Sequence, residues 1–396
     1  MNWLRYLLTS LALLVSVSSC WLVVGALRDP ASSFHGLLGS ALWSTFGPHL
    51  VVLAAAALLP NLLPGLRIKG KLATLSLLLA LSALVGAGSI TTAIILATNH
   101  AGGSANPVKG LLISAMEESG PDDTVIFHPS AKQPLLAAIY RPVDTSKPAP
   151  VIVYIHGGGF KTGSYLETDA DLRWFANKGW LVISVQYRLW TDSMPTWDKA
   201  PSDVACALAW VGLHAKEYGG DISRLAILGD SAGGNLAINT AYAAAADTIG
   251  PVCGGVVPVA DAVVVQYPAV DPLAVYEHGY PVPGFEPKML MGGYIGGDPY
   301  TLPDRVQAIS SYHFLSSQAP PTLIIAPEKD ALVPPWSVYR FTDYARLAGV
   351  DIELIRMPFS SHVFNQTASG SIGNQARLSI TLRYLTEKGL APERGR

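Results

Sequence analysis

The chain has 396 residues, of which half are hydrophobic and 14% are charged, and its formal net charge is −2. Ordinary soluble proteins are roughly 25% charged, and a near-neutral chain offers no basis for binding nucleic acid. Three cysteines are too few for a disulfide framework. Cys206 and Cys253 either pair or remain two buried free thiols, and we expect the free thiols because buried cysteine packs as a small hydrophobic residue.

The apolar residues are concentrated at the N-terminus. Residues 1–100 predict a transmembrane region with three spans, over about 7–27, 37–63 and 72–98. The first and third runs contain no charge and are at least as long as the roughly 20 residues that a helix needs to cross a bilayer. Pro48 and Pro60 interrupt the middle run, which is therefore either a kinked span or a re-entrant pair.

Positively charged residues predict the orientation of these spans. Arg67, Lys69 and Lys71 lie in the short loop before the third span, which places that loop on the cytoplasmic side. With three crossings, Arg5 is also cytoplasmic and everything after residue 100 is extracytoplasmic. The spans contain no internal acidic or basic residue, so they lack the usual marks of an ion path and are interpreted as an anchor.

Two alternatives apply to the first span. A cleaved signal peptide would remove it, and V-S-S-C at Val17–Cys20 resembles a lipoprotein cleavage site. The residues that follow Cys20 are W-L-V-V-G-A-L, where a lipoprotein has a polar tether, and further apolar runs come after them. We therefore expect an uncleaved span.

A linker rich in Gly, Asn and Pro, Asn99–Lys109, leads into the second region, residues 101–396. Continuously apolar runs, typical of strands buried on both faces of a parallel sheet, alternate there with amphipathic segments. This alternation predicts a three-layer α/β domain, with an antiparallel edge near Val125–Phe127 and Leu135–Tyr140. The expected strands are Val151–Ile155, Leu181–Tyr187, Leu225–Gly229, Ala262–Tyr267, Thr322–Ala326 and Ile352–Ile355, and the clearest expected helices are Pro201–Tyr218, Ser337–Gly349 and Asn374–Lys388.

The motif G-D-S-A-G-G at Gly229–Gly234 follows an expected strand and precedes a helix-compatible run. G-x-S-x-G between a strand and a helix is the pattern of a nucleophile elbow, a sharp turn that exposes a serine in a strained backbone conformation. The glycines are needed because side chains two positions on either side of the serine would collide with the neighbouring strand and helix. Outside this setting the motif is an ordinary turn, but here it predicts that Ser231 is a nucleophile.

A serine nucleophile needs a base and an acid that orients the base. In a fold of this kind, the acid and the histidine follow later strands, in the order Ser, Asp or Glu, His. Asp330 follows the strand at Thr322–Ala326, and His362 follows the strand at Ile352–Ile355. We prefer them to the rival acid Glu328 and to the histidines His278 and His313, which have less strand-end context.

A triple glycine ends another expected strand, in I-H-G-G-G-F-K-T-G-S at Ile155–Ser164. Gly158 and Gly163 have the glycine spacing of a phosphate-binding P-loop, but the required lysine is replaced by Ser164. Bare backbone N–H groups instead suit an oxyanion hole, which stabilises the negative oxygen formed during acyl transfer. We expect the amides of Gly157, Gly158 and Ala232 to form it, and we assign Gly159 only to the turn.

The motifs H-G-G-G-F at His156–Phe160 and G-D-S-A-G-G together resemble the hormone-sensitive-lipase-like family of α/β-hydrolases. Y-R-L at Tyr187–Leu189 and D-V-A-C-A-L-A-W at Asp203–Trp210 are also similar to this family. The resemblance implies hydrolysis of carboxylic esters without a metal or other cofactor. It assigns Ser231 as nucleophile, His362 as base and later acid, Asp330 as its partner, and His156 and Asp230 as supporting residues around the site.

Members of that family usually carry an N-terminal helical cap over the site, whereas only a short stretch precedes the first strands here. Either the linker or Pro272–Tyr312, with its Met289-Leu290-Met291 cluster, is expected to cover the pocket instead. Methionine packs well both in a protein core and in the wall of an acyl-binding pocket. We interpret these methionines as core residues, which is the more frequent role of such a cluster.

The sequence thus predicts an α/β-hydrolase domain behind about three transmembrane helices, acting as a membrane-anchored carboxylesterase or lipase on a small-molecule or lipid ester. The same residues would serve an acyltransferase, and a non-catalytic membrane scaffold is the alternative from another class. Intact motifs argue against the scaffold. Acyl length, alcohol group and oligomeric state are not encoded in any of these patterns.

Overall fold

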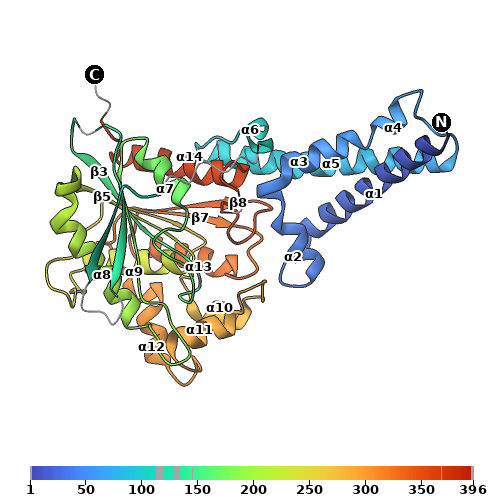
Figure 1. Cartoon of the computed structure of the whole chain (residues 1–396). Coiled ribbons are helices and arrows are strands. Elements are labelled where there is room, and N and C mark those ends of the chain that lie inside the picture. The colour runs from blue at the N-terminus through green and yellow to red at the C-terminus, as the bar shows by residue number, and fades with distance from the viewer. Residues whose placement is uncertain (1, 113–119, 129–133, 145, 367, 394–396) are drawn as a thin grey trace. The chain divides into compact units, whose positions relative to one another are not determined.

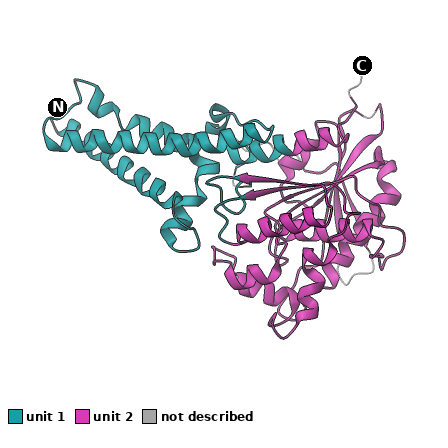
Figure 2. Cartoon of the chain, turned by 180° about the vertical axis from the view of Figure 1, so that it is seen from behind, with its two compact units in different colours: residues 1–115, 327–331, 357–380 teal, residues 116–326, 332–356, 381–396 magenta. Residues whose placement is uncertain are grey.

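A computed structural model describes residues 2–112, 120–128, 134–144, 146–366 and 368–393 (Figure 1). The chain divides into two compact units, which are coloured separately in Figure 2. The first, called the helical unit, comprises Met1–Ala115, Pro327–Ala331 and Met357–Ile380. The second, called the sheet unit, comprises Met116–Ala326, Leu332–Arg356 and Thr381–Arg396. Each unit is described by itself.

In the part of the helical unit that the structure describes, three helices are long and apolar enough to cross a membrane: Trp3–Ala26, Trp43–Leu62 and Lys71–His100. The middle one starts six residues later than expected, because Phe34–Ala41 forms a separate short helix that Ser33 caps through its side chain. Pro48 lies inside the middle helix and Pro60 begins its last turn. The helices in the N-terminal part of this unit are α1 Asn2–Ala26, α2 Phe34–Ala41, α3 Trp43–Ala56, α4 Leu59–Leu62, α5 Lys71–His100 and α6 Pro107–Leu111, and the first half of α14 Ile372–Glu387 also belongs to it.

The long helices alternate in direction. Cys20 of α1 contacts the carbonyl of Leu79 in α5, and the side chain of Val23 in α1 fills the space beside Gly86, so α1 and α5 run parallel. The middle helix runs the opposite way, because Gly47 packs on Thr91 whereas Asn61 donates a hydrogen bond to Ser76. These contacts follow the middle segment along α5 in one direction.

Among the described residues, the sheet has eight strands in the order β1-β2-β4-β3-β5-β6-β7-β8. The pairs from β4 through β3, β5 and β6 to β7 are parallel, and β1 and β2 form the expected antiparallel edge. The strands are β1 Asp123–His128, β2 Leu135–Tyr140, β3 Ala149–Ile155, β4 Leu181–Val185, β5 Gly220–Asp230, β6 Ala262–Gln266, β7 Thr322–Pro327 and β8 Ile352–Met357. The prediction of a mostly parallel α/β sheet is confirmed.

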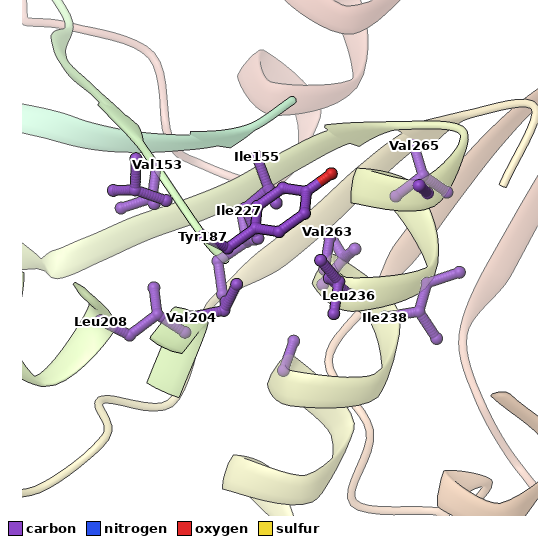
Figure 3. Packing of buried hydrophobic residues seen from close by; sticks show 14 of the residues in the cluster. Val153, Ile155, Tyr187, Val204, Leu208, Ile227, Leu236, Ile238, Val263 and Val265 are labelled. Atoms are coloured by element: carbon purple, nitrogen blue, oxygen red, sulfur yellow. The ribbon is translucent and has the colours of Figure 1, made fainter. Parts of the chain in front are cut away.

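Every residue of β3, β4 and β6 is buried, as expected for strands covered on both faces. Figure 3 shows Val153, Ile227 and Val263 from three adjacent strands packing beside Val204 and Leu236 from the covering helices. The remaining helical segments are α7 Asp169–Ala176, α8 Lys199–His214, η1 Ala215–Tyr218, α9 Ala232–Ala245, α10 Pro272–His278, α11 Pro287–Ile295, α12 Pro303–Ile309, η2 Ser311–Phe314, α13 Pro335–Leu347 and α14 Ile372–Glu387.

The two cysteines of the sheet unit form a disulfide, so the expectation of free thiols is wrong. Cys206 lies in α8, and Cys253 lies in the loop that follows α9. Their Cα atoms are 5.8 Å apart, within the range that a disulfide requires. The two cysteines are 47 residues apart in the sequence, and the loop after α9 brings Cys253 back to α8. Cys20, in α1, remains a free thiol.

Candidate active site

Ser231 occupies the turn between β5 and α9 in a backbone conformation that L-residues rarely adopt. Its φ and ψ are 55° and −114°, and it is 8% exposed. The conformation is held at both ends, because the Ser231 N–H donates to the Gln266 carbonyl at 2.9 Å and the Ala269 N–H donates to the Ser231 carbonyl at 3.2 Å. This is the strand, sharp turn and helix that the motif predicts.

The glycines on either side of Ser231 are required by close backbone contacts. A Cβ atom on Gly229 would lie 2.4 Å from the Gly233 carbonyl oxygen, and one on Gly233 would lie 2.1 Å from the Ile155 carbonyl oxygen. Real Cβ contacts are essentially never shorter than 3.0 Å. The elbow therefore fits between β3 and α9 only with bare backbone at both positions.

The triple glycine lies directly beside the elbow. A Cβ on Gly157 would be 3.5 Å from the Ser231 Cβ, so the backbone of Gly157 borders the serine. Gly158 and Gly159 have φ values of 101° and 62°, and a Cβ on Gly158 would lie 2.1 Å from the Thr162 carbonyl oxygen. The glycines thus form a tight turn whose backbone approaches the serine, as an oxyanion hole would require.

His156 supports this turn from within the core. Its ring is fully buried and stacks on Tyr187 at a centroid distance of 4.3 Å, and its Nδ1 lies 2.8 Å from the Gly157 carbonyl oxygen. The Tyr187 hydroxyl lies 3.0 Å from the carbonyl oxygen of His156 and 3.1 Å from that of Gly157. Burial lowers the pKa of His156 to about 4, so the ring is neutral near pH 7. A neutral ring can donate from Nδ1 and so fix the Gly157 carbonyl.

Asp230, the other predicted supporting residue, is fully buried at the end of β5. The Tyr154 hydroxyl donates to its carboxylate at 3.2 Å. Tyr154 belongs to β3, so this bond links the two strands that end at the glycine turn and at the elbow. Asp230 therefore lies behind the serine, inside the sheet.

Asp330 and His362 form a hydrogen-bonded pair within the helical unit. His362 Nδ1 lies 2.7 Å from an Asp330 carboxylate oxygen, and the Asp330 side chain is only 2% exposed. The segments that carry the two residues are joined by backbone hydrogen bonds, from Glu328 N–H to the Met357 carbonyl and from Lys329 N–H to the Ser360 carbonyl, both 2.9 Å. A histidine whose Nδ1–H is bound to a carboxylate presents Nε2 as a base.

The rival residues have other surroundings. Glu328, two residues from Asp330, is exposed. His278 lies beside the carboxylate of its neighbour Glu277, and His313 contacts the amide of Gln307. Of the residues considered from the sequence, Asp330 is the acid that is bonded to His362.

One of the two segments expected to cover the site packs on the glycine turn. Pro272–Tyr312 contains α11, and the Leu290 side chain of α11 would lie 2.9 Å from a Cβ on Gly159. Tyr294, one turn further along, stacks on Phe160 with ring centroids 3.7 Å apart. Leu290 and Met291 are buried whereas Met289 is 39% exposed. The Met cluster thus combines core packing with one partly open side chain.

Two supporting features were given no role by reasoning from the sequence. Tyr187 fixes the glycine turn, and Arg188 pairs with the buried Asp203 of α8 through its side chain at 2.6 Å and its backbone N–H at 2.9 Å. The pair ties Y-R-L to D-V-A-C-A-L-A-W, two motifs that the sequence offered only as family resemblance. The signal in the sequence was an aspartate directly before the apolar run V-A-C-A-L-A-W, because a carboxylate among apolar residues indicates a fixed partner.

A family model described as BD-FAE matches residues 137–343, which include the glycine turn, the elbow and Asp330. The match covers just over half of the chain. The chain belongs to this family. Its relatives are likewise esterases, so the resemblance to hormone-sensitive-lipase-like α/β-hydrolases is confirmed.

Three curated relatives come from Mycobacterium tuberculosis. The chain is 27% identical to the probable carboxylic ester hydrolase LipM over 245 residues, covering 59% of this chain and 54% of LipM. It is 26% identical to the esterase LipQ, covering 61% and 57% of the two chains. It is 41% identical to the carboxylesterase NlhH over 99 residues, 25% of this chain and 30% of NlhH. The chain therefore spans little more than half the length of LipM and LipQ.

Among solved structures, the thermophilic esterase Est2 from Thermogutta terrifontis has the same fold. Its native form superposes with a TM-score of 0.57 at 24% identity, covering 71% of this chain and 96% of Est2. A form phosphonylated by sarin superposes with a TM-score of 0.59 at 23% identity, covering 70% and 98%. The superposition covers nearly all of Est2, so the two chains share the α/β-hydrolase fold.

We predict that Gly233→Ala strongly destabilises the protein. The added Cβ would lie 2.1 Å from one backbone carbonyl oxygen and 2.3 Å from another, so β3 and α9 must separate at the elbow. The matched control is Gly212→Ala in α8, where the nearest atom would be 3.6 Å away and where alanine favours the helix by about 0.8–1 kcal/mol. Thermal unfolding of both variants tests this. An unchanged midpoint for Gly233→Ala would contradict the geometry of the elbow.

We predict that His156 makes stability depend on pH between about 6.5 and 4. Its pKa in the folded state, about 4, is below the value of about 6.5 expected when unfolded, so the unfolded chain binds the proton more tightly. The contribution is fully present above pH 6.5 and is lost as pH falls toward 4, by about 3 kcal/mol in total. His156→Phe should flatten the dependence of the thermal midpoint over this range. Tyr187→Phe, which keeps the stacked ring, should lower the midpoint without flattening it, and equal slopes in wild type and His156→Phe would refute the assignment.

Proposed function

We propose that the chain is a serine carboxylesterase anchored in a membrane by its N-terminal helices. Membership of the family and the strained Ser231 beside bare glycine backbone support this proposal most directly. In it, Ser231, His362 and Asp330 act as a catalytic triad. The substrate is a carboxylic ester, the class of compound on which the relatives act by name.

The proposed reaction begins when Ser231 Oγ attacks the ester carbonyl and His362 Nε2 accepts the hydroxyl proton. Asp330 holds the imidazole in the required tautomer and stabilises the imidazolium. The negative oxygen of the tetrahedral intermediate accepts hydrogen bonds from the N–H groups of Gly157, Gly158 and Ala232. Each such donor is typically worth about 2.7–4 kcal/mol of transition-state stabilisation.

Collapse of this intermediate breaks the bond between the acyl carbon and the alcohol oxygen, and His362 gives its proton to the departing alcohol. Water then attacks the acyl-enzyme, with His362 again as base, and releases the carboxylic acid. An acceptor other than water would turn the same residues into an acyltransferase, and product analysis distinguishes the two. Apart from the ester and water, both steps use only the chain's own residues.

We further propose that α1, the middle helix and α5 cross the bilayer, with the catalytic residues on the extracytoplasmic side. The alternating directions of the helices agree with three crossings, because Asn61 of the middle segment meets Ser76 near the start of α5. The basic loop that carries Arg67 and Lys69 joins these two helices and favours the cytoplasmic side. The Cys206–Cys253 disulfide agrees with an oxidising compartment for the sheet unit.

We predict that Ser231→Ala abolishes turnover of a short-chain ester and labelling by a fluorophosphonate probe. Asp330→Asn should lower kcat by about 10⁴, because the imidazole then adopts the wrong tautomer. Glu328→Gln, two residues away and exposed, is the matched control and should stay close to wild type. Turnover and probe labelling on purified full-length protein provide the measurements. If Glu328→Gln is the impaired variant, the acid has been assigned to the wrong residue.

We predict that a membrane-impermeant maleimide reaches the sheet unit but not the basic loop in intact cells. Lys216→Cys and Gly65→Cys, each in a Cys20→Ser background, place one free thiol at an exposed position on either side. Gly65 has no atom within 4 Å of its Cβ position, and its replacement keeps the neighbouring positive charges. Lys216→Cys should label at once and Gly65→Cys only after permeabilisation. The reverse pattern would invert the proposed orientation.

A further inference from the structure

Each of the three candidate spans has one terminus that lies beside the two segments that carry Asp330 and His362. At the end of α1, the Lys329 ammonium donates a hydrogen bond of 2.9 Å to the carbonyl of Arg28. Arg28 follows the last residue of the first span by two positions, and Lys329 is the immediate neighbour of Asp330. A lysine at the carbonyl end of a helix is favourably placed. The contact therefore joins the acid-bearing segment to the end of a span.

The start of the middle span contacts the segment that follows His362. A Cβ on Gly373, in the first turn of α14, would lie 3.0 Å from the Ser44 Cβ, so the two backbones approach closely. Gly110 of α6 fits between Ile372 and Pro48, with Cβ contacts of 3.1 and 3.3 Å. The His362 segment thus packs onto the first two turns of α3.

The residues after α5 are tied to α14 by hydrogen bonds. The Ser104 N–H donates to the Ser379 hydroxyl at 2.8 Å, and the Asn106 N–H donates to the Gln375 side-chain oxygen at 2.8 Å. The Gln375 amide donates back to the Asn106 carbonyl at 3.2 Å. With the contacts at α1 and α3, this brings the third span to the same acid–histidine segments.

These contacts set the depth of the acid–histidine pair in a bilayer. A helix rises 1.5 Å per residue, and the headgroup regions add about 5–8 Å to each side of a hydrocarbon core about 30 Å thick. Arg28 lies about 3 Å beyond its span on this rise, and a single lysine side chain separates it from the chain at Asp330. The pair is thereby placed at the depth of the headgroups.

Exposed apolar side chains occur on the segments around this end of the helical unit. Leu27 follows α1, Phe34 begins α2, Val108 and Leu112 belong to α6 and its end, and each is at least 65% exposed. Val363, the neighbour of His362, is 40% exposed. Apolar side chains at the membrane interface bury their area among the headgroups and acyl chains.

We infer that the substrate is an acyl ester carried by a lipid that resides in the bilayer, whose ester carbonyl lies at headgroup depth. The inference rests on the proposed hydrolase function and names the substrate class of the same site. Hydrolysis breaks the bond between acyl carbon and alcohol oxygen, and one water adds to give a carboxylic acid and an alcohol. A lipid ester reaches His362 by lateral diffusion, without leaving the membrane.

The test uses the full chain in vesicles of a diether phosphatidylcholine, which cannot itself be hydrolysed. A fluorogenic long-chain acyl glycerolipid is mixed into the vesicles, and a water-soluble short-chain ester is assayed in parallel. The vesicles are then prepared with tenfold more diether lipid at the same bulk concentration of the glycerolipid. If the glycerolipid is at a subsaturating mole fraction, its rate of hydrolysis should fall about tenfold. The rate for the soluble ester should stay unchanged.

The inference is overturned if the glycerolipid is not hydrolysed, or if its rate of hydrolysis follows its bulk concentration alone. In either case, turnover of the soluble ester would still support the hydrolase proposal. Loss of both activities means that the hydrolase proposal itself has failed. Phe34→Ser and Val108→Ser should lower the ratio of membrane-ester to soluble-ester turnover at least fivefold. Leu347→Ser, at an 84% exposed position of α13, is the control and should leave the ratio unchanged. Equal ratios in all three variants also overturn the inference.

Discussion

The backbone of Ser231 is the constraint on which the rest of the candidate site depends. A non-glycine residue with a φ of 55° and a ψ of −114° carries strain of order 1–3 kcal/mol, which persists only where the surroundings fix it. Here the fixing groups are the backbone partners at Gln266 and Ala269. The missing side chains at Gly229 and Gly233 let β3 and α9 close around the turn, and this closure brings Gly157 to the edge of the serine.

Parts of the fold and site that are encoded locally could be predicted from the sequence. The elbow is one, because its glycines, strand and helix are consecutive in the chain. The parallel strands are another, because continuous apolar runs report burial on both faces. The pairing of Asp330 with His362 followed from chain order, since neighbouring strands β7 and β8 end beside each other. The joint action of these residues with Ser231 stays a prediction.

Features that depend on contacts between distant segments could not be predicted. Cys206 and Cys253 pair because the loop after α9 returns to α8, and no spacing rule reports that path. The start of the middle span was missed because α2 is itself apolar, so its boundary appears only in the capping geometry of Ser33. The association of Ser104 with Ser379 spans 275 residues and leaves no periodic signal in either segment.

The helical unit does more for the acid and histidine segments than a tether would. A tether needs only the linker. Here, in contrast, a neighbouring segment packs so closely on each of the glycines at 103, 110 and 373 that a side chain at that position would collide with it. Backbones that approach this closely specify one arrangement, because displacement of either partner leaves a void or a clash. The segments that orient the proposed general base are therefore packed into the same core as the spans. An arrangement of this kind makes the three long apolar helices part of the structure that holds His362, and so couples the proposed chemistry of the site to the integrity of the helical unit.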